Sequence, residues 1–407
     1  MLQSRNLSGC QIFSQSQMPS EWVCVPLKDR IELLYGRALK KDIRKMGAVD
    51  VFGSNGKVGS HNVSWLDGPG VLVGRKGTVG AVHYSEKPYW PIDTVYYVKT
   101  IHNDQLRYLY YLLDYLPLKS LNAATGVPGL SRRDVYALRG AFPPTAEQAP
   151  ITQVLDAVNT AIWLTQEIIN RVGDLRRALM QELLPPWIGF KHFDANRTLE
   201  GVESIELASD VCDVCNGSTP SRTEGRYWRN GTIAWLPTGM VHQRTITHAN
   251  QFVTELALKE CSINLLPSGT VLIGMIGQGR TRGMAAYLDM KACINQNFGA
   301  FVPRQKVLGK WLFHFFDFHY NRLREIGGGT NQGALNCYML KRLRLPLPPI
   351  DRQEDVSAIL DEVERLERSY RLSLQHREQL KKSLMHDLLT GTVRVDPILF
   401  KNEEEPP

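Results

Sequence analysis

The sequence predicts an α+β protein in which two globular domains of mixed α/β structure are separated by two long antiparallel helices, as a tandem repeat with a pseudo-twofold axis. Three observations predict this fold. One segment, which contains Gln148, recurs 205 residues later, where the matching residue is Gln353. The recurring segment has the apolar spacing of a long helix, and each copy follows a block with mixed strand and helix signals.

The repeat is the most informative feature of the chain. Residues 142–148 read Phe-Pro-Pro-Thr-Ala-Glu-Gln, and residues 347–353 read Leu-Pro-Pro-Ile-Asp-Arg-Gln. The same offset continues without a gap to the end of the recurring segment. Its matched pairs are Leu155-Asp156 with Leu360-Asp361, Glu182-Leu183-Leu184 with Asp387-Leu388-Leu389 and, upstream, Leu130 with Leu335. Further upstream, Gly74 and Gly77 resemble Gly274 and Gly277 at an offset of 200 residues. This pattern indicates a tandem duplication.

Each recurring segment is predicted to form one long helix. Pro143-Pro144 and Pro348-Pro349 precede the helices, and Pro185-Pro186 and Gly391 follow them. Apolar residues recur every three or four positions, which is typical of a helix seam. The predicted seam residues are Ile151, Val154, Val158, Ile168, Val172, Leu175 and Leu179 in the first copy and Val356, Ile359, Val363, Leu366, Leu380 and Leu384 in the second. We expect the two helices to pack on each other; the alternative is that each packs only on its own domain.

These signals predict the division of the chain. The expected segments are an N-terminal segment at 1–20, a first domain at 21–144, a first helix at 145–186, a second domain at 187–349, a second helix at 350–391 and a tail at 392–407. Within the domains, β-branched and aromatic runs predict strands at 71–73, 94–98, 232–235 and 271–273, and helices are predicted at 104–115 and 310–324. Pattern alone does not give the domain topology.

Composition narrows the class of protein. Of the 407 residues, 43% are hydrophobic and 22% charged, which is typical of soluble globular proteins. No apolar run is long enough to cross a membrane, and the polar N-terminus lacks the apolar core of a secretion signal. The seven cysteines are odd in number and scattered, as expected in a reducing compartment. We therefore expect a cytoplasmic protein without membrane partners.

Positive charge lies in two blocks that suit contact with a polyanion. Residues 21–144 and 196–349 each hold 17 basic and 11 acidic residues, a net charge of +6, whereas the recurring helical segments are acidic. Arg and Lys neutralise phosphates, and Arg, Asn and Gln pair with purine edges. One such loop alone is usually a solvated turn, but many occur here in two equivalent domains. The candidate DNA-binding residues are Lys41, Arg44, Lys45, Ser54, Asn55, Lys57, Arg75, Lys76, Arg132, Arg133, Ser218, Thr219, Ser221, Arg222, Arg226, Tyr227, Arg229, Gln243, Arg244, Gln278, Arg280, Arg282, Thr330, Asn331 and Gln332.

From about Trp22 to Val395, the chain resembles the specificity subunits of type I restriction-modification systems. The most specific motifs are Gly217-Ser-Thr-Pro-Ser-Arg222 with Tyr227-Trp228 and Ile233-Ala-Trp235 after it, Gly333-Ala-Leu335 running into Leu343–Pro349, and the ending Leu388–Arg394. The pattern of Pro-Pro, a long helix and a closing Leu-Leu occurs twice, as in that family. The first half departs from it, because residues 37–62 lack the Gly-Ser-Thr-Pro-Ser loop and hold only Gly53-Ser-Asn-Gly56.

The resemblance implies a role for each part. Each basic block would be a target-recognition domain that reads one half of a split, asymmetric double-stranded DNA site. The helical pair would hold the two domains about one DNA turn apart and so fix the length of the unread spacer between the half-sites. A helix of about 38 residues is roughly 57 Å long, which is enough to bridge one DNA turn of roughly 34 Å. The same helices would dock two methyltransferase subunits and, through them, up to two restriction subunits. S-adenosylmethionine, ATP and magnesium are then expected on those partners, with no cofactor in this chain.

The motifs of catalysis expected for an enzyme of this system are absent from the sequence. None of the Pro-Pro pairs lies in the Asp/Asn-Pro-Pro-Tyr/Phe motif of amino-methyltransferases, and no Gly-x-x-x-x-Gly-Lys-Ser/Thr phosphate loop occurs. Cys212 and Cys215 have the spacing of half a zinc site without a second pair, so a structural role is favoured and no metal is expected. His242 and His248 lie among arginines, which favours DNA contact or simple exposure over catalysis. Two alternatives stay open: the specificity portion of a fused restriction-methyltransferase, and a coiled-coil scaffold that binds only proteins.

Overall fold

The computed structural model describes residues 18–121, 129–189, 199–277, 279–326 and 333–396. The chain forms two compact units. The first comprises residues 1–167 with 372–407, and the second comprises residues 168–371. Each unit therefore contains one globular domain and part of each long helix, whereas the sequence predicted a linear division.

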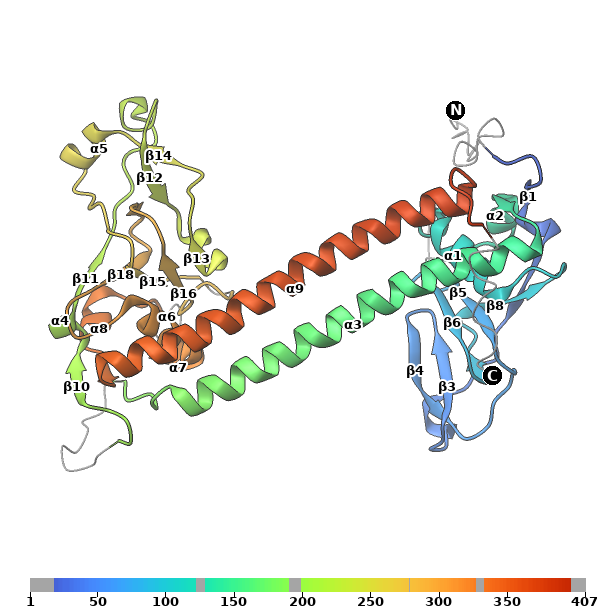
Figure 1. Ribbon diagram of the computed structural model, residues 1–407, viewed down its shortest axis with the longest axis horizontal. Coiled ribbons are helices and arrows are strands. Elements are labelled where there is room, and N and C mark those ends of the chain that lie inside the picture. The colour runs from blue at the N-terminus through green and yellow to red at the C-terminus, as the bar shows by residue number, and fades with distance from the viewer. Residues whose placement is uncertain (1–17, 122–128, 190–198, 278, 327–332, 397–407) are drawn as a thin grey trace. The chain divides into compact units, whose positions relative to one another are not determined.

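Two long helices, α3 (Thr145–Leu183) and α9 (Ile350–Thr390), are each continuous (Figure 1). In the first unit, Ile151 and Leu155 near the start of α3 share a hydrophobic core with Leu388 and Leu389 at the end of α9. In the second unit the ends are exchanged, and the shared core holds Met180 and Leu184 of α3 with Val356 and Leu360 of α9. Within each unit the helices therefore run antiparallel, as predicted, and both also pack on the domain.

The described residues of the first unit's domain form three sheets. Strands β1 (Val23–Pro26) and β9 (Arg139–Phe142) form an antiparallel pair. A four-stranded sheet has the order β2-β8-β5-β6, from Ile31–Tyr35, Val95–Thr100, Gly70–Gly74 and Val82–Ser85. A three-stranded sheet has the order β4-β3-β7, from Gly56–His61, Val49–Gly53 and Tyr89–Pro91, with β3 and β7 parallel. The helices are α1 (Leu106–Tyr115), α2 (Arg132–Ala137) and the 3-10 turns η1 (Leu27–Asp29), η2 (Lys41–Ile43) and η3 (Leu118–Leu121).

The domain of the second unit repeats this topology and adds one strand, β13, to the larger sheet. Strands β10 (Ser204–Leu207) and β19 (Arg344–Leu347) pair directly before α9, as β1 and β9 do before α3. The larger sheet has the order β11-β18-β15-β16-β13, from Cys212–Asn216, Phe298–Pro303, Val271–Gly274, Ala285–Leu288 and Thr245–Ile246. The smaller has the order β14-β12-β17, from Phe252–Val253, Ile233–Leu236 and Cys293–Ile294, with β12 and β17 parallel. The helices are α4 (Ala208–Val211), α5 (Glu255–Glu260), α6 (Gly309–Phe318), α7 (Tyr320–Ile326), α8 (Cys337–Lys341), η4 (Gly225–Tyr227) and η5 (Thr238–Gln243).

The strands predicted at 71–73, 94–98, 232–235 and 271–273 are confirmed as parts of β5, β8, β12 and β15. The helix predicted at 104–115 is confirmed as α1, but the single helix predicted at 310–324 is wrong. It is divided into α6 and α7, because His319 leaves helical geometry at φ −93° and ψ 20°. The buried ring of His319 donates a hydrogen bond through Nε2 to the carbonyl oxygen of Pro185, at 2.9 Å.

The recurring polar residues connect each long helix to its domain in the same way. Asp156 of α3 accepts hydrogen bonds from Arg107 and Tyr111 of α1. Asp361, 205 residues later, accepts hydrogen bonds from Lys310 and His314 of α6. The donors in α6 lie 203 residues after those in α1, so the duplication extends to individual contacts. Burial would raise the pKa of Asp361, but the hydrogen bond from His314 lowers it below its usual range.

The seam residues are only partly buried. Ile151, Val172, Val356 and Val363 are buried and Val154, Val158, Leu179 and Leu384 are half-buried, but Ile168, Leu175, Ile359, Leu366 and Leu380 are exposed. The prediction that these five lie buried between the helices is therefore wrong. Ile169 and Leu360 occupy the buried positions instead. One residue turns an α-helix by about 100°, so a shift of one position moves a side chain to another face.

Candidate nucleic-acid interface

In the second domain, the loop at residues 217–222 is held tightly by its neighbours. A Cβ atom on Gly217 would lie 1.8 Å from the carbonyl oxygen of Ile294, so only glycine allows this close approach. The indole of Trp235 donates a hydrogen bond to the Ser218 carbonyl, and that of Trp228 to the Ser221 carbonyl, each at 3.0 Å. The Gly-Ser-Thr-Pro-Ser-Arg loop is thus held in place by two tryptophan side chains.

Arg222 ends this loop as an oriented, exposed cation. Its guanidinium lies 3.7 Å from the ring centroid of Trp228 and donates a hydrogen bond of 2.6 Å to Gln251. Nearby, the Thr219 hydroxyl donates to Gln296 at 2.5 Å. These contacts hold one guanidinium and two amides, which are side-chain types that pair with base edges. Gln251 and Gln296 were not predicted, since each comes from a distant part of the chain with no motif around it.

The loops between β5 and β6 and between β15 and β16 are equivalent in the two domains. A Cβ on Gly74 would lie 2.2 Å from the Thr78 carbonyl oxygen, and one on Gly274 would lie 2.3 Å from that of Thr281. The Leu130 N–H donates to the Arg75 carbonyl, and that of Leu335 to the Met275 carbonyl, each at 2.9 Å. These equivalences place Arg75 and Lys76 in one domain and Arg280 and Arg282 in the other on matching loops.

Within the second loop, the two arginines differ. Arg280 is exposed, and its carbonyl accepts a hydrogen bond of 2.8 Å from Tyr320. Arg282 is half-buried and donates to the Gly333 carbonyl, and its Nε is buried without an acceptor among the described residues. His242 of η5 lies 3.2 Å from the Thr281 hydroxyl. Arg280 is therefore available on the surface, whereas Arg282 fixes the loop.

Three predicted DNA contacts in the second domain serve the protein itself. Arg244 binds both carboxylate oxygens of Asp317, at 2.6 and 2.9 Å, and also Glu364 at 3.1 Å. Tyr227 is buried and donates to Glu260 at 2.9 Å, and the exposed Arg226 is paired with Glu224 and Glu260. The prediction of Arg244 and Tyr227 as DNA contacts is wrong in this conformation, because carboxylates from distant segments occupy their donors.

In the first domain, several predicted arginines bind backbone carbonyls. Arg44 donates to the carbonyls of Leu39 and Val58. Arg75 donates to that of Asp93 at 2.7 Å, and Arg132 to that of Leu33 at 3.3 Å.

The guanidiniums of Arg75 and Arg132 both lie over the ring of Tyr35, at 5.1 and 4.6 Å from its centroid. Tyr35 is 48% exposed, and an adjoining hollow is lined by Lys28 and Arg133 among other residues. Tyr35 was missed, since nothing in its sequence surroundings distinguishes it from a strand residue.

The remaining candidates lie mostly at the surface. Exposed side chains are those of Lys41, Lys45, Asn55, Lys57, Lys76, Arg133, Ser221 and Arg229, and Ser54, Ser218, Thr219 and Gln243 are half-buried. Lys57 pairs with Asp50, and the Ser54 carbonyl contacts the ring of His83 at 3.1 Å. Gln278, Thr330, Asn331 and Gln332 lie outside the described residues.

Cys212 and Cys215 both belong to β11, but they face opposite ways. Cys212 packs in the core with α6 and the long helices, whereas Cys215 packs against the other core of the domain. Alternate faces of a strand separate residues three positions apart, so the two thiols do not converge on one ion. Burial raises the pKa of the Cys212 thiol to about 12. Among the described residues, no group of three or more His, Cys, Asp or Glu side chains could hold a metal ion.

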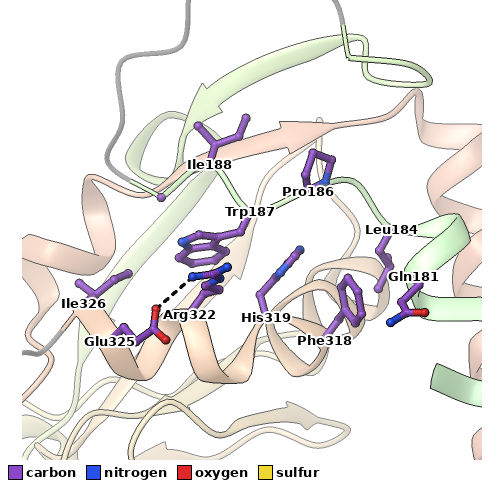
Figure 2. A pocket seen from close by; sticks show the side chains of 11 residues that line it. Gln181, Leu184, Pro186, Trp187, Ile188, Phe318, His319, Arg322, Glu325 and Ile326 are labelled. Carbon is purple, nitrogen blue, oxygen red and sulfur yellow. Dashed lines mark hydrogen bonds and ion pairs between the residues drawn. The ribbon is translucent and has the colours of Figure 1, made fainter. Parts of the chain in front are cut away.

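A cavity of about 880 Å³ lies in the second unit at the end of α3, on residues separate from the loops above (Figure 2). Trp187, Phe318 and His319 line it, and Arg322 and Glu325 form an ion pair of 3.4 Å at its side. Trp187 stacks on Phe315. The cavity brings together no candidate nucleophile with a base, so the polar surface of the chain remains the candidate site.

Two domains that share one topology and carry basic side chains on matching loops define a protein built by duplication, with two basic surfaces. The family of type I restriction modification DNA specificity domains matches residues 19–173 and 200–375, and the chain belongs to that family of specificity subunits. In the described residues no helix is long and apolar enough to cross a membrane.

Named relatives agree with this assignment, and one solved structure has the same fold. The chain is 24% identical over 306 residues to the type I restriction enzyme MjaVIII specificity subunit of Methanocaldococcus jannaschii, covering 72% of this chain and 71% of the relative. It is 21% identical to the EcoR124I/EcoR124II specificity subunit of Escherichia coli, covering 68% of each. The crystal structure of the type I restriction-modification S subunit from M. genitalium has the same fold, with a TM-score of 0.64, 14% identity, and coverage of 90% of this chain and 96% of that one.

Proposed function

We propose that this specificity subunit is non-catalytic and that each of its domains reads one half of a bipartite, asymmetric site on double-stranded DNA through the major groove. The observation that carries the proposal is the contrast between the two domains. They share strand order and loop positions, yet their loops hold different side chains, with Arg222, Gln251 and Gln296 in one and Arg75 and Arg132 around Tyr35 in the other. One scaffold with two readers suits a site with two unlike halves.

The chemistry of the loops supports reading of bases as well as binding of phosphates. Arg makes paired hydrogen bonds to guanine, and Gln makes them to adenine. Arg222 and Gln251 already orient each other, so little side-chain freedom is lost on binding. The exposed lysines Lys41, Lys45 and Lys76 suit phosphate contacts, which position the duplex without selecting sequence.

The long helices would set the spacer and dock two methyltransferase subunits. Helices of 39 and 41 residues have lengths of roughly 58 and 62 Å. Their exposed apolar side chains include Leu175 of α3 and Leu380 of α9, 48% and 50% exposed, which the repeat makes equivalent. Equivalent apolar surfaces support two copies of one partner. S-adenosylmethionine would then lie on the methyltransferase subunits, and ATP and magnesium on restriction subunits.

The test is to co-express the chain with the methyltransferase subunit of its system and to map N6-methyladenine across the genome. The expected result is one split motif with two specified halves and a spacer of fixed length. A continuous motif, or methylation without sequence preference, would contradict reading by two domains. Failure of any complex to form would favour a scaffold that binds other proteins.

A further inference from the structure

Four charged side chains of the second unit form a mostly buried network. The guanidinium of Arg244 donates hydrogen bonds to both carboxylate oxygens of Asp317 in α6. Its Nε also donates one to Glu364 in α9. Asp317 also accepts a hydrogen bond from Arg176 of α3. The side chains of Arg176 and Asp317 are each 17% exposed. Two cations and two carboxylates thus lie together where water has little access, and the exposed Arg368 also pairs with Glu364 at 3.7 Å.

The network holds its ionised form firmly. Burial would raise the pKa of Asp317, but hydrogen bonds from Arg244 outweigh burial and lower it. Burial likewise would lower the pKa of Arg244, and the hydrogen bonds with Asp317 raise it instead. Removing one member would leave a buried charge without its partner, which is costly in proteins.

Arg244 also ends the 3-10 helix η5 in a strained backbone conformation. Its φ is 63° and its ψ is −55°, in a region that side chains other than glycine rarely adopt. Its carbonyl accepts a hydrogen bond of 2.6 Å from the Tyr287 N–H of β16. The guanidinium contacts therefore stabilise a turn that would otherwise be unfavourable.

The turn that Arg244 fixes carries residues of the candidate interface. Gln243 directly precedes it, and His242 contacts Thr281 in the loop that holds Arg280. Arg244 thus connects η5 directly with α6 and α9 and, through Asp317, with Arg176 of α3. The contacts that both units share, such as Lys310 with Asp361, connect only α1 or α6 to a long helix.

We propose that Arg244 is a positioning residue for sequence reading, which couples η5 and its neighbouring loop to the long helices so that the second domain discriminates its half-site. The inference rests on the proposed function. It adds that the long helices, which would dock the partner subunits, hold η5 and the loop with Arg280 in place through Arg244. It assigns Arg244 no contact with DNA. The first domain, with its shared helix contacts alone, would not depend on this residue.

The experiment uses the full-length chain in complex with its methyltransferase subunits. Wild type, Arg244→Ala, Arg244→Lys and Glu364→Gln are compared by methylome mapping and by fluorescence anisotropy with duplexes altered in one half-site at a time. Arg244→Ala should reduce discrimination between correct and altered sequences about tenfold or more at the half-site that the second domain reads. Discrimination at the half-site of the first domain should stay unchanged. Arg244→Lys, which cannot bind two carboxylates in the same forked geometry, should recover only part of it. Glu364→Gln should give a smaller loss at the same half-site.

Arg322→Ala is the matched control, because it removes an exposed ion pair with Glu325 in the same domain and should leave discrimination unchanged. Wild-type discrimination in a folded Arg244→Ala protein, or equal losses at both half-sites, would overturn the inference. If Arg244→Ala fails to fold, Glu364→Gln decides, and unchanged discrimination in that variant overturns it. A wild-type complex without a split motif would refute the proposed function itself, which separates the two failures.

Discussion

The side-chain oxygen of Gln148 accepts a hydrogen bond of 2.8 Å from the backbone N–H of Gln105, the residue directly before helix α1. Gln353, 205 residues later, accepts one of 2.9 Å from Leu308, directly before α6. Both glutamine side chains are fully buried, and each also donates to the carbonyl of the first proline of its Pro-Pro pair. The recurring motif thus docks each long helix on its domain.

Substituting either glutamine should destabilise the unit that contains it. Gln148→Ala or Gln353→Ala would leave a buried N–H without an acceptor, at a cost of about 1–3 kcal/mol in the free energy of unfolding. Urea denaturation, followed by hydrogen exchange to locate the loss, measures this. Gln153→Ala, at an exposed position of α3, is the control and should change stability by under about 0.5 kcal/mol. Equal stability of all three variants would mean that the contact is dispensable.

Charges at exposed apolar positions of the long helices should prevent partner binding without unfolding the chain. Leu175→Asp with Leu380→Asp places carboxylates where apolar area would be buried in a complex, and both sites are about half exposed in the free protein. We expect an unchanged circular dichroism spectrum and melting temperature, with loss of co-purifying methyltransferase subunits. Gln153→Asp serves as the control for added charge. A full complement of bound subunits in the double variant would reject this docking surface.

Arg222→Ala should weaken binding to one half of the DNA site. If the guanidinium contacts a base, the loss is about 1–3 kcal/mol and falls on duplexes that carry the second half-site. Anisotropy titrations over a salt series measure it. Arg322→Ala, which removes a cation of α7 paired with Glu325, should bind as wild type does. A uniform loss on all duplexes, with a shallower salt dependence, would reassign Arg222 to phosphate contact.

His319 should make stability depend on pH. Burial lowers the pKa of His319 below its usual 6.5, although its hydrogen bond to Pro185 opposes the shift. Below pH 6.5 the unfolded chain then binds a proton that the folded chain does not, so stability falls as the pH drops from 6.5 toward the folded pKa.

Urea denaturation at pH 7.5, 6.5 and 5.5 tests this expectation. His319→Gln should flatten the dependence by up to about 1.4 kcal/mol per pH unit. His248→Gln, at an exposed position, is the control and should keep the wild-type dependence. Parallel curves for wild type and His319→Gln would refute the assignment.

Sequence reasoning was most successful where a physical constraint is local or repeated. The offset between Gln148 and Gln353 predicted the duplication, and the structure repeats it down to the hydrogen bonds of Asp156 and Asp361. The motif at Gly217–Arg222 carried the family resemblance, and the structure adds that this loop lies close to the backbone of Ile294. The prediction that Leu175 and Leu380 are buried between the helices was wrong, because a regular apolar spacing does not distinguish neighbouring helix faces when several are apolar.

The sequence by itself determined the two-domain repeat, its long antiparallel helices and its family, because apolar periodicity, paired prolines and recurring motifs are properties of neighbouring residues. Only the tertiary structure decided which cations face solvent. Arg222 and Arg244 look alike in sequence, yet one lies exposed on Trp228 and the other binds Asp317 and Glu364. The physical reason is that the partners of Arg244 come from segments 73 and 120 residues away, and only folding brings them within hydrogen-bonding distance.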